Sequence, residues 1–303
     1  MERNDQRDIL IARAKRTQAI MTEGTFSCDG TSVDIGEMLI AARQGTRLVV
    51  PDDWDGILDQ ATRLCTRTTP APIMVRQETT LAALERLAPM RAEGLAALNF
   101  ASARRPGGGW DSGATAQEET LARASGLIAC LAEAPDYYQS NRRHEHLFYT
   151  DHAIWSPQVP FFARDDGSLI KHPYTAGIIT MPAPNVGGMN RLEASDLHIL
   201  PGLWRRRIRC VLALAIVHQV KHLVLGAWGC GAFGNDPILV ARWFREVLAP
   251  SESWLRGLES VTFAIVDTSR RKSCLAAFTE AFLPHDPSTP RDGPPPSDRI
   301  TAP

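Results

Sequence analysis

The chain has 303 residues, 44% of them apolar, and a formal net charge of −1 at pH 7. This apolar share favours a globular core, and the balanced charge excludes the strongly basic surface typical of a nucleic-acid-binding protein. The longest apolar stretches, such as 211–217, are far too short to span a bilayer, and no apolar secretory signal follows the polar start. We therefore expect a cytoplasmic protein without membrane or nucleic-acid partners.

Residues 1–69 are predicted to form an N-terminal helical accessory segment. Residues 5–22 are basic and helix-forming, and Gly24 follows them as a stop signal, so a helix that leans on the main body is expected there. The stretch 26–70 mixes short apolar pieces with turn residues. This mixture favours an attachment to the next domain over an independent domain.

Residues 70–283 are predicted to form the main domain, because strand and helix patterns alternate along them. The expected strands are 73–75, 95–100, 178–181, 222–225 and 261–266, with strand or hairpin pieces at 147–149 and 153–155. The expected helices are 81–87, 203–220, 237–248 and 272–282, with Arg205 to Arg207 on a solvated helix face. This alternation predicts an α/β sandwich with a largely parallel sheet, which binds ligands at the carboxyl ends of its strands. The proline-rich end, 284–303, is expected to be disordered and is given no role.

Gly107, Gly108 and Gly109 stand between the expected strand 95–100 and a helix start near Gln117. Three consecutive glycines pack nothing and cost backbone entropy, so close backbone approach or a positive φ is the usual reason for them. Free N–H groups beside a helix N-terminus form an anion site. The loop therefore predicts a phosphate-bearing ligand.

Two adjacent carboxylates, Glu118 and Glu119, lie in the first turn of that helix. Thr115 and Glu118 fit a capping box, which gives Glu118 a structural explanation. Glu119 points roughly 100° away from its neighbour and is expected near the mouth of the glycine loop. The alternative is that both acids only complement the helix dipole. Apolar residues at helical spacing are expected to pack this helix into the core: Leu121, Ala124, Ile128 and Leu131.

A second glycine-rich loop, 226–237, follows another expected strand. Gly229, Gly231 and Gly234 formally match the dinucleotide fingerprint, and Asp267 ends the next strand as a ribose-binding acid would. However, too few strand–helix units follow this loop, and Asp267 lies beyond the usual spacing of about 20 residues. These two facts argue against a dehydrogenase.

What remains of this second loop is another set of N–H groups at a helix start, suited to the other side of a diphosphate. Asn235 or Asp236 is expected to cap the helix, with Pro237 as its first residue. Phe233 either stacks on a sugar or base of the ligand or packs beneath the loop.

Other signatures in the chain are weak. None of its six cysteines forms a C-x-x-C pair, which favours reduced thiols over disulfides or a zinc site. His218 and His222 lack the glutamate and third ligand of a zinc helix, so we interpret them as a solvated helix end, and the run 144–146 is equally unspecific. No serine-hydrolase elbow and no P-loop are present. These patterns therefore argue against a zinc site, a serine hydrolase and a P-loop ATPase.

The order of three glycines, a seven-residue spacer and Gln117-Glu118-Glu119 resembles the signature of poly(ADP-ribose) glycohydrolases, whose catalytic core is a macrodomain. The surrounding sequence resembles the bacterial, microbial-type branch of that family. Further matching stretches are 98–103, 121–127, 181–185 and 226–237, and the resemblance extends from about residue 5 to residue 283. It implies a macrodomain-like three-layer α/β/α sandwich with a mixed sheet, preceded by the helical accessory segment.

The resemblance also implies roles for individual residues. Glu119 would be the catalytic acid and base, Glu118 would orient the sugar, and Asn99 would bind ribose hydroxyls. The remaining implied substrate-binding residues are Gln117, the glycines Gly107, Gly108 and Gly109 on one side of the diphosphate, Gly229, Gly231 and Gly234 on the other, and Phe233 at the terminal ribose. The implied substrate is poly(ADP-ribose) or an ADP-ribosylated protein. The implied reaction is hydrolysis of the ribose–ribose O-glycosidic bond, from chain ends, with release of ADP-ribose and without metal or cofactor.

Glycosidic cleavage passes through an oxocarbenium-like transition state, so an acid must protonate the leaving oxygen and then activate water. No partner carboxylate is evident in the sequence, and we hypothesise that the substrate's own diphosphate stabilises the cation. The helix N-terminus lowers a carboxyl pKa, whereas burial raises it. Two alternatives stay open: a macrodomain that binds ADP-ribose without hydrolysis, and a hydrolase of mono-ADP-ribosyl protein, modified DNA or O-acetyl-ADP-ribose.

Overall fold

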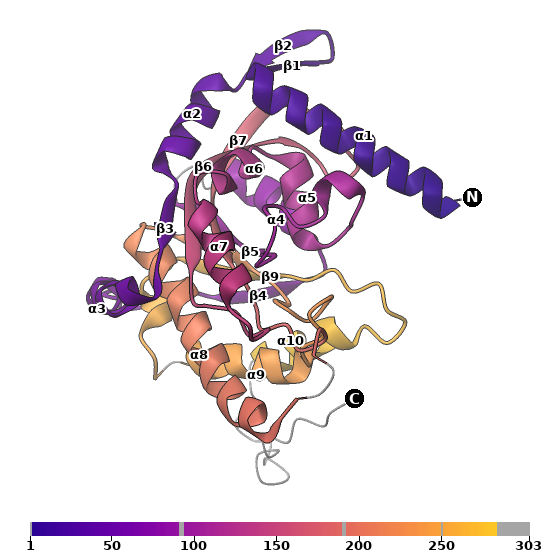
Figure 1. Cartoon of the computed structure of the whole chain (residues 1–303). Coiled ribbons are helices and arrows are strands. Elements are labelled where there is room, and N and C mark those ends of the chain that lie inside the picture. The colour runs from indigo at the N-terminus through magenta and orange to yellow at the C-terminus, as the bar shows by residue number, and fades with distance from the viewer. Residues whose placement is uncertain (1, 91–93, 190–191, 250, 284–303) are drawn as a thin grey trace.

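The computed structural model describes residues 2–90, 94–189, 192–249 and 251–283 (Figure 1). The proline-rich end, 284–303, for which disorder is expected, lies outside these residues. Within the described residues, no helix combines the length and the apolar character that crossing a lipid bilayer requires.

A mixed sheet forms the centre of the fold. Its strands are β3 (Arg47–Val49), β4 (Ile73–Arg76), β5 (Leu95–Phe100), β6 (Ala153–Ala163), β7 (Leu169–Met181), β8 (His222–Leu225) and β9 (Ser260–Ala264). In the described part of the chain these seven strands follow the order β3-β6-β7-β5-β8-β9-β4. The strands from β7 to β4 pair in parallel, whereas β6 is antiparallel to both β3 and β7. The predicted mixed, largely parallel sheet is confirmed.

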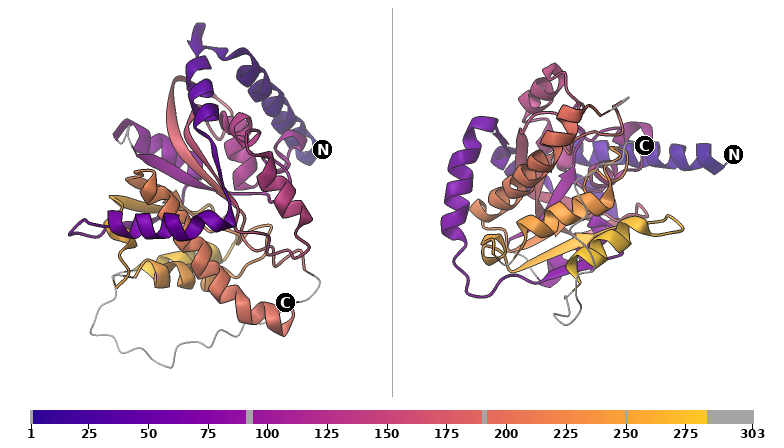
Figure 2. Two further views of the ribbon diagram at one scale, coloured as in Figure 1. Left: turned by 60° about the vertical axis from the view of Figure 1, so that its left-hand side comes forward. Right: turned by 90° about the horizontal axis from the view of Figure 1, so that it is seen from below.

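Helices cover both faces of the sheet (Figures 1 and 2). One face carries α3 (Trp54–Leu64), α8 (Ala194–Val217), α9 (Pro237–Val247) and α10 (Ser273–Phe282). The other face carries α2 (Gly36–Gly45), α4 (Thr80–Leu87), α5 (Gln117–Ala124), α6 (Leu127–Leu131) and α7 (Pro135–Arg143). Because side chains alternate along a strand, Ala96 and Leu98 of β5 join the first core, and Leu95 and Ala97 join the second. This arrangement confirms the three-layer α/β/α sandwich.

The N-terminal segment begins with the expected helix, α1 (Glu2–Glu23), which ends at Gly24 with a left-handed φ of +71°. A hairpin of β1 (Thr25–Cys28) and β2 (Thr31–Asp34) follows. The segment then joins the main sheet, because β3 pairs with β6, and α3 packs on α8. Helix α1 itself lies along α5 and the turn after the glycine loop, with Ala14 packed against Trp110 and Ala122.

Several predicted boundaries differ from the structure. Helix α8 begins at Ala194 and continues across Pro201, whereas a start at residue 203 is predicted. Residues 147–149 form no strand. The helix predicted from Gln117 through Leu131 is two helices, because Ser125 has extended backbone and its hydroxyl donates to the Leu121 carbonyl oxygen.

The prediction of a solvated face at Arg205 to Arg207 is wrong for Arg207, whose side chain is fully buried. Its Nε donates to Asp151 Oδ1 at 2.9 Å, and Nη1 donates to the Pro182 carbonyl oxygen at 3.1 Å. Its Nη2 donates to the carbonyl oxygens of Tyr149 and Thr150. A buried guanidinium is tolerated only when its donors are satisfied, and here they join loops that are far apart in sequence.

The prediction of a solvated helix end at His218 and His222 is wrong for His222. His222 is buried at the start of β8, where its ring hydrogen-bonds with Ser260 Oγ at 2.8 Å. The His218 ring stacks on Trp155 with a centroid separation of 4.5 Å. His222 is therefore a packing element of the fold, whereas His218, at the end of α8, is exposed as predicted.

The buried Arg207 generates a stability prediction. We expect Arg207→Ala to lower the free energy of unfolding by about 3–5 kcal/mol, because it leaves Asp151 and three carbonyl groups without their buried partner. Arg206→Ala is the matched control: its side chain is 46% exposed and pairs with the same Asp151, so a loss below about 1 kcal/mol is expected. Urea unfolding followed by circular dichroism measures both, and equal losses would contradict the assigned role.

Candidate active site

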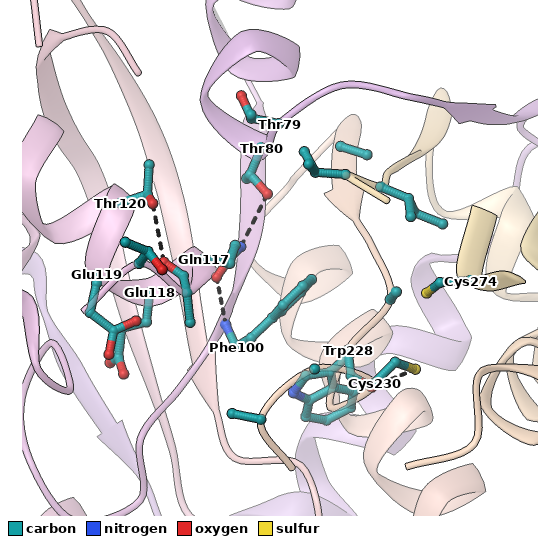
Figure 3. A pocket seen from close by; sticks show the side chains of 18 of the residues that line it. Thr79, Thr80, Phe100, Gln117, Glu118, Glu119, Thr120, Trp228, Cys230 and Cys274 are labelled. Carbon is teal, nitrogen blue, oxygen red and sulfur yellow. Dashed lines mark hydrogen bonds between the residues drawn. The ribbon is translucent and has the colours of Figure 1, made fainter. Parts of the chain in front are cut away.

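A cavity of about 610 Å³ lies at the carboxyl ends of β5, β8 and β9. Its walls come from the start of α4, the start of α5, the loop after β8 and the segment after β9 (Figure 3). Figure 3 shows the α5 side chains on one side and Trp228, Cys230 and Cys274 on the other. The position matches the edge at which parallel strands of an α/β sheet present their ligand site.

The first glycine loop holds the α5 carboxylates. Gly107 and Gly108 have left-handed φ angles of +70° and +57°, and the Gly109 N–H donates to Glu119 Oε1 at 3.0 Å. A Cβ at Gly108 would lie 2.4 Å from Glu119 Oε1 and 3.2 Å from Glu118 Oε2. Only glycine fits there. The three glycines contact the carboxylates, and the described lining of the cavity includes both glutamates but none of these glycines.

Helix α5 buries both carboxylates at its N-terminus. Glu118 is 2% exposed and Glu119 is 9% exposed. The predicted capping box is wrong: the N-cap residue is Ala116, without a side-chain cap, and Glu118 turns toward the end of β5 instead. There Glu118 Oε2 accepts the Ser102 N–H at 2.6 Å, and Oε1 accepts from Asn99 Nδ2 at 3.3 Å. If Glu118 formed the capping box, its carboxylate could not accept these two hydrogen bonds from the residues at and after the end of β5.

Burial dominates the electrostatics of Glu118. It raises the pKa of the Glu118 carboxyl from its ordinary value of 4.5 to about 8. The hydrogen bonds from Ser102 and Asn99 oppose this rise, and the neighbouring Glu119 adds to it. At neutral pH Glu118 is therefore mostly protonated, so it adds little negative charge beside Glu119.

Asn99 and Gln117 tie α5 to the sheet. Asn99 is fully buried, and its Nδ2 donates to Thr180 Oγ1 as well as to Glu118. Gln117 Oε1 accepts the Phe100 N–H at 2.9 Å, while its Nε2 donates to the Leu98 carbonyl oxygen at 2.8 Å and to Thr80 Oγ1. Both residues thus position the carboxylates, and their direct contact with substrate stays a prediction.

The second glycine loop closes the opposite wall. Gly229 has a φ of +74°, and a Cβ there would lie 2.7 Å from Ala183 Cβ. Gly234 has a φ of +65°, and its Cβ would meet Gly187 Cα at 2.9 Å, whereas a Cβ at Gly231 would project into open space. Close packing against 183–187 thus requires glycine at two of the three positions.

Asn235 organises this second loop, a role that the sequence did not reveal. Its Nδ2 donates to the carbonyl oxygens of Pro184 at 2.8 Å and Gly229 at 3.0 Å, and its Oδ1 accepts from Trp204 Nε1 at 3.3 Å. The helix cap is Asp236, which accepts the Ile238 N–H at 2.8 Å. The sequence contained one indication of this role: Asn235 and Asp236 are both suitable N-cap residues, but the helix needs only one.

Phe233 is half-buried and lines the cavity. Its ring centroid lies 6.0 Å from that of Tyr149, and its carbonyl oxygen accepts the Gly187 N–H at 2.8 Å. The ring is therefore partly packed and partly available to a ligand. Its predicted place at the terminal ribose stays a prediction.

Asp267, after β9, is a structural residue. Its Oδ1 accepts the Ser269 N–H, and its Oδ2 accepts the Cys274 N–H at 2.8 Å at the start of α10. The hydrogen bond from the Ser269 hydroxyl is the largest factor that holds the pKa of Asp267 below its ordinary range. This carboxylate caps a helix, which agrees with the exclusion of a dinucleotide-binding role. Sequence reasoning did not place Thr79, Thr80, Asp165 and Cys274 in the cavity wall.

A three-layer sandwich with two glycine loops around a buried carboxylate pair defines a macrodomain-type site. The family model "Microbial-type PARG, catalytic domain" matches residues 14–164. No curated protein is similar enough in sequence to count as a match.

Solved structures extend this likeness over most of the chain. Poly(ADP-ribose) glycohydrolase from Thermomonospora curvata is 40% identical, with a TM-score of 0.87 over 91% of this chain and 100% of that one. The same enzyme bound to the inhibitor ADP-HPD is 39% identical, with a TM-score of 0.85 over the same shares. The Deinococcus radiodurans enzyme in complex with ADP-ribose is 44% identical, with a TM-score of 0.76 over 81% of this chain and 97% of that one. The chain belongs to the microbial-type poly(ADP-ribose) glycohydrolase family.

Gly108 generates a prediction about activity. We expect Gly108→Ala to lower the turnover of poly(ADP-ribose) about 100-fold, because its Cβ would displace the Glu119 carboxylate and a shift near 1 Å has consequences of this size. Gly56→Ala is the control, because a Cβ there projects into open space within α3. The assay is release of ADP-ribose at equal concentrations of folded protein. Full activity of Gly108→Ala would contradict the close packing described above.

Glu118 generates a prediction about pH and stability. Because its folded-state pKa is raised, the folded chain keeps a proton that the unfolded chain loses above about pH 4.5, so stability falls as the pH rises toward 8. Each pKa unit corresponds to about 1.4 kcal/mol. The free energy of unfolding of Glu118→Gln, relative to that of the wild type, should thus increase by a few kcal/mol from pH 5 to pH 8. The measurement is urea unfolding at both values, with the exposed Glu37→Gln as control, and an unchanged difference would exclude the raised pKa.

Proposed function

We propose that the chain hydrolyses the ribose–ribose O-glycosidic bonds of poly(ADP-ribose) and releases ADP-ribose. The single observation that supports this most is the buried pair Glu118 and Glu119, held at the edge of a cavity of about 610 Å³. This volume lies in the range of small-ligand sites. Membership of a glycohydrolase family, with relatives solved in complex with ADP-ribose and with ADP-HPD, supports the same substrate class.

We assign the acid and base role to Glu119. It would protonate the bridging oxygen as the bond breaks, and its carboxylate would then remove a proton from the attacking water. The Gly109 N–H fixes its orientation. Glu118, mostly neutral at pH 7, would hydrogen-bond with the sugar without the repulsion of a second charge.

No second carboxylate is free to act from across the bond among the described residues that line the cavity. Glu78 pairs with Arg86, Asp165 accepts from Thr79 Oγ1 at 2.6 Å, and Asp267 caps α10. This supports the hypothesis that the substrate's own diphosphate stabilises the cationic transition state. The backbone of the second glycine loop, whose Gly229 and Gly231 line the cavity, would hold that diphosphate in place, whereas the first loop holds the carboxylates.

The remaining assignments follow from the same proposal. Phe233 would lie against the terminal ribose, and Asn99 and Gln117 would contact the sugar or hold the residues that do. A cavity with room for one ADP-ribose unit favours release from chain ends. The six cysteines are all free thiols, which supports the cytoplasm as the compartment.

The catalytic assignment is tested by two isosteric variants. We expect Glu119→Gln to retain its affinity for ADP-ribose and to lose about 10²–10⁴-fold in turnover, the usual contribution of a general acid and base. Glu118→Gln should lose less, because an amide can still hydrogen-bond with the sugar. The measurement is release of ADP-ribose from a poly(ADP-ribosyl)ated protein beside the wild type.

Equal losses in the two variants would refute the division of roles. Tight ADP-ribose binding without release by the wild type would favour the non-hydrolysing alternative. Release from mono-ADP-ribosyl protein, modified DNA or O-acetyl-ADP-ribose, but not from polymer, would assign the site to another linkage. Oligomeric early products would contradict cleavage from chain ends.

A further inference from the structure

A second cavity of about 150 Å³ lies between α1 and α5, and we call it the arginine notch. Its charged lining residues are Arg13 and Arg16 of α1, Arg123 of α5, and Arg164 and Asp165 after β6. The volume is several times the ~30 Å³ that one water molecule occupies in the liquid. A phosphate-sized group therefore fits.

The positive charge of the notch is poorly compensated. Three of its guanidinium groups donate hydrogen bonds to backbone carbonyl oxygens: Arg13 to Asp165, Arg16 to Gly167 and Arg123 to Trp110. Across the described ranges of the chain, none of these three forms an ion pair with a carboxylate, and Arg16 Nε is buried without a hydrogen-bond partner. Burial lowers the pKa of both Arg16 and Arg123, and the charge of Arg13 adds to each effect.

The acidic groups nearby are committed elsewhere or exposed. Arg164 pairs with Glu85 at 2.7 Å, and the Asp165 carboxylate accepts from Thr79 Oγ1 at 2.6 Å. Asp166, the neighbour of Asp165, is exposed. Desolvated cations that face one another favour an anion between them, and guanidinium groups match phosphate oxygens in geometry.

The notch adjoins the catalytic cavity. Both are lined by Thr115, Thr120 and Asp165, and Thr115 and Thr120 flank the carboxylate pair in sequence. The charge of Glu119 also acts on Arg123. Glu119 would protonate the bridging oxygen, so this oxygen lies beside its carboxylate. The ADP-ribose unit on the leaving side of the bond therefore starts there and extends out of the cavity that holds the terminal unit.

We propose that the arginine notch binds the diphosphate of the ADP-ribose unit on the leaving side of the scissile bond. This inference rests on the proposed function and adds a subsite for the polymer to it. It also assigns a role to α1: the accessory helix supplies Arg13 and Arg16, so the segment before the main domain takes part in substrate choice. Polymer would then bind more tightly than free ADP-ribose.

The test compares the affinities of a two-unit ADP-ribose oligomer and of free ADP-ribose, measured in a Glu119→Gln background so that no oligomer is consumed. Replacing Arg13 and Arg16 together by Gln should weaken oligomer binding about tenfold and leave ADP-ribose binding unchanged. Lys15→Gln, which removes one positive charge from an exposed position of α1 outside the notch, should change neither. In the active enzyme, the double variant should raise KM for polymer and leave kcat unchanged.

A second variant covers loss of folding, because Arg13 and Arg16 also bind the turn after β6. Gln6→Glu adds a negative charge at the exposed rim of the notch without removing an arginine, and it should weaken oligomer binding alone. Inorganic pyrophosphate should reduce the affinity for the oligomer to that for free ADP-ribose at concentrations below those that displace ADP-ribose from the catalytic cavity.

Equal loss for both ligands, an equal effect of Lys15→Gln, or no preference for the oligomer would overturn the subsite. If Gln6→Glu does not alter the competition by pyrophosphate, then pyrophosphate acts at another site, and the competition does not support the notch. The affinity readout does not depend on hydrolysis. A chain that prefers the oligomer but releases nothing would thus refute the proposed function and keep the notch.

Discussion

Burying two neighbouring carboxylates at the start of one helix is the constraint on which the site depends. Glu118 and Glu119 leave water only because N–H groups of Ser102 and Gly109 and the amide of Asn99 meet their oxygens. Those donors belong to the end of β5 and to the glycine loop that follows it. The loop can approach so closely because Gly108 has no side chain. Strand β5, the glycine loop and α5 therefore form one unit: the contacts that pack them together are the same contacts that bury and orient the two carboxylates.

The opposite wall is stabilised differently. There, buried polar side chains donate hydrogen bonds to the backbone carbonyl oxygens of loops. Arg207 joins the segments 149–151 and 182 to α8, and Asn235 joins 184 to the second glycine loop. Neither residue faces the ligand in our proposal. Their hydrogen bonds hold the segments on either side of Ala183, which lines the cavity, in the way that supporting residues fix the geometry of a catalytic site.

Local patterns were enough to predict the strands that end at the site, a largely parallel sheet, both glycine loops and a helix that begins at Pro237 after a cap at Asn235 or Asp236. The mixed sheet was implied by the family resemblance. They failed where a distant partner decides the outcome. A run of three arginines looks solvated until Asp151 and the carbonyl groups that Arg207 meets are known. Thr115 and Glu118 fit a cap until Ser102 competes for the same carboxylate. Likewise, no spacing rule reveals that Asn235 bridges two loops, because those contacts span up to 51 residues.

The order in which the cavity wall is encoded has a consequence for synthesis on the ribosome. The carboxylates occupy positions 118 and 119, but the wall opposite them uses residues 227–233 and 264–274. A nascent chain that has emerged as far as residue 225 already holds both acids, without the loop and the α10 start that enclose a substrate. The cavity wall is therefore complete only when β9, the last strand of the described sheet, lies between β8 and β4.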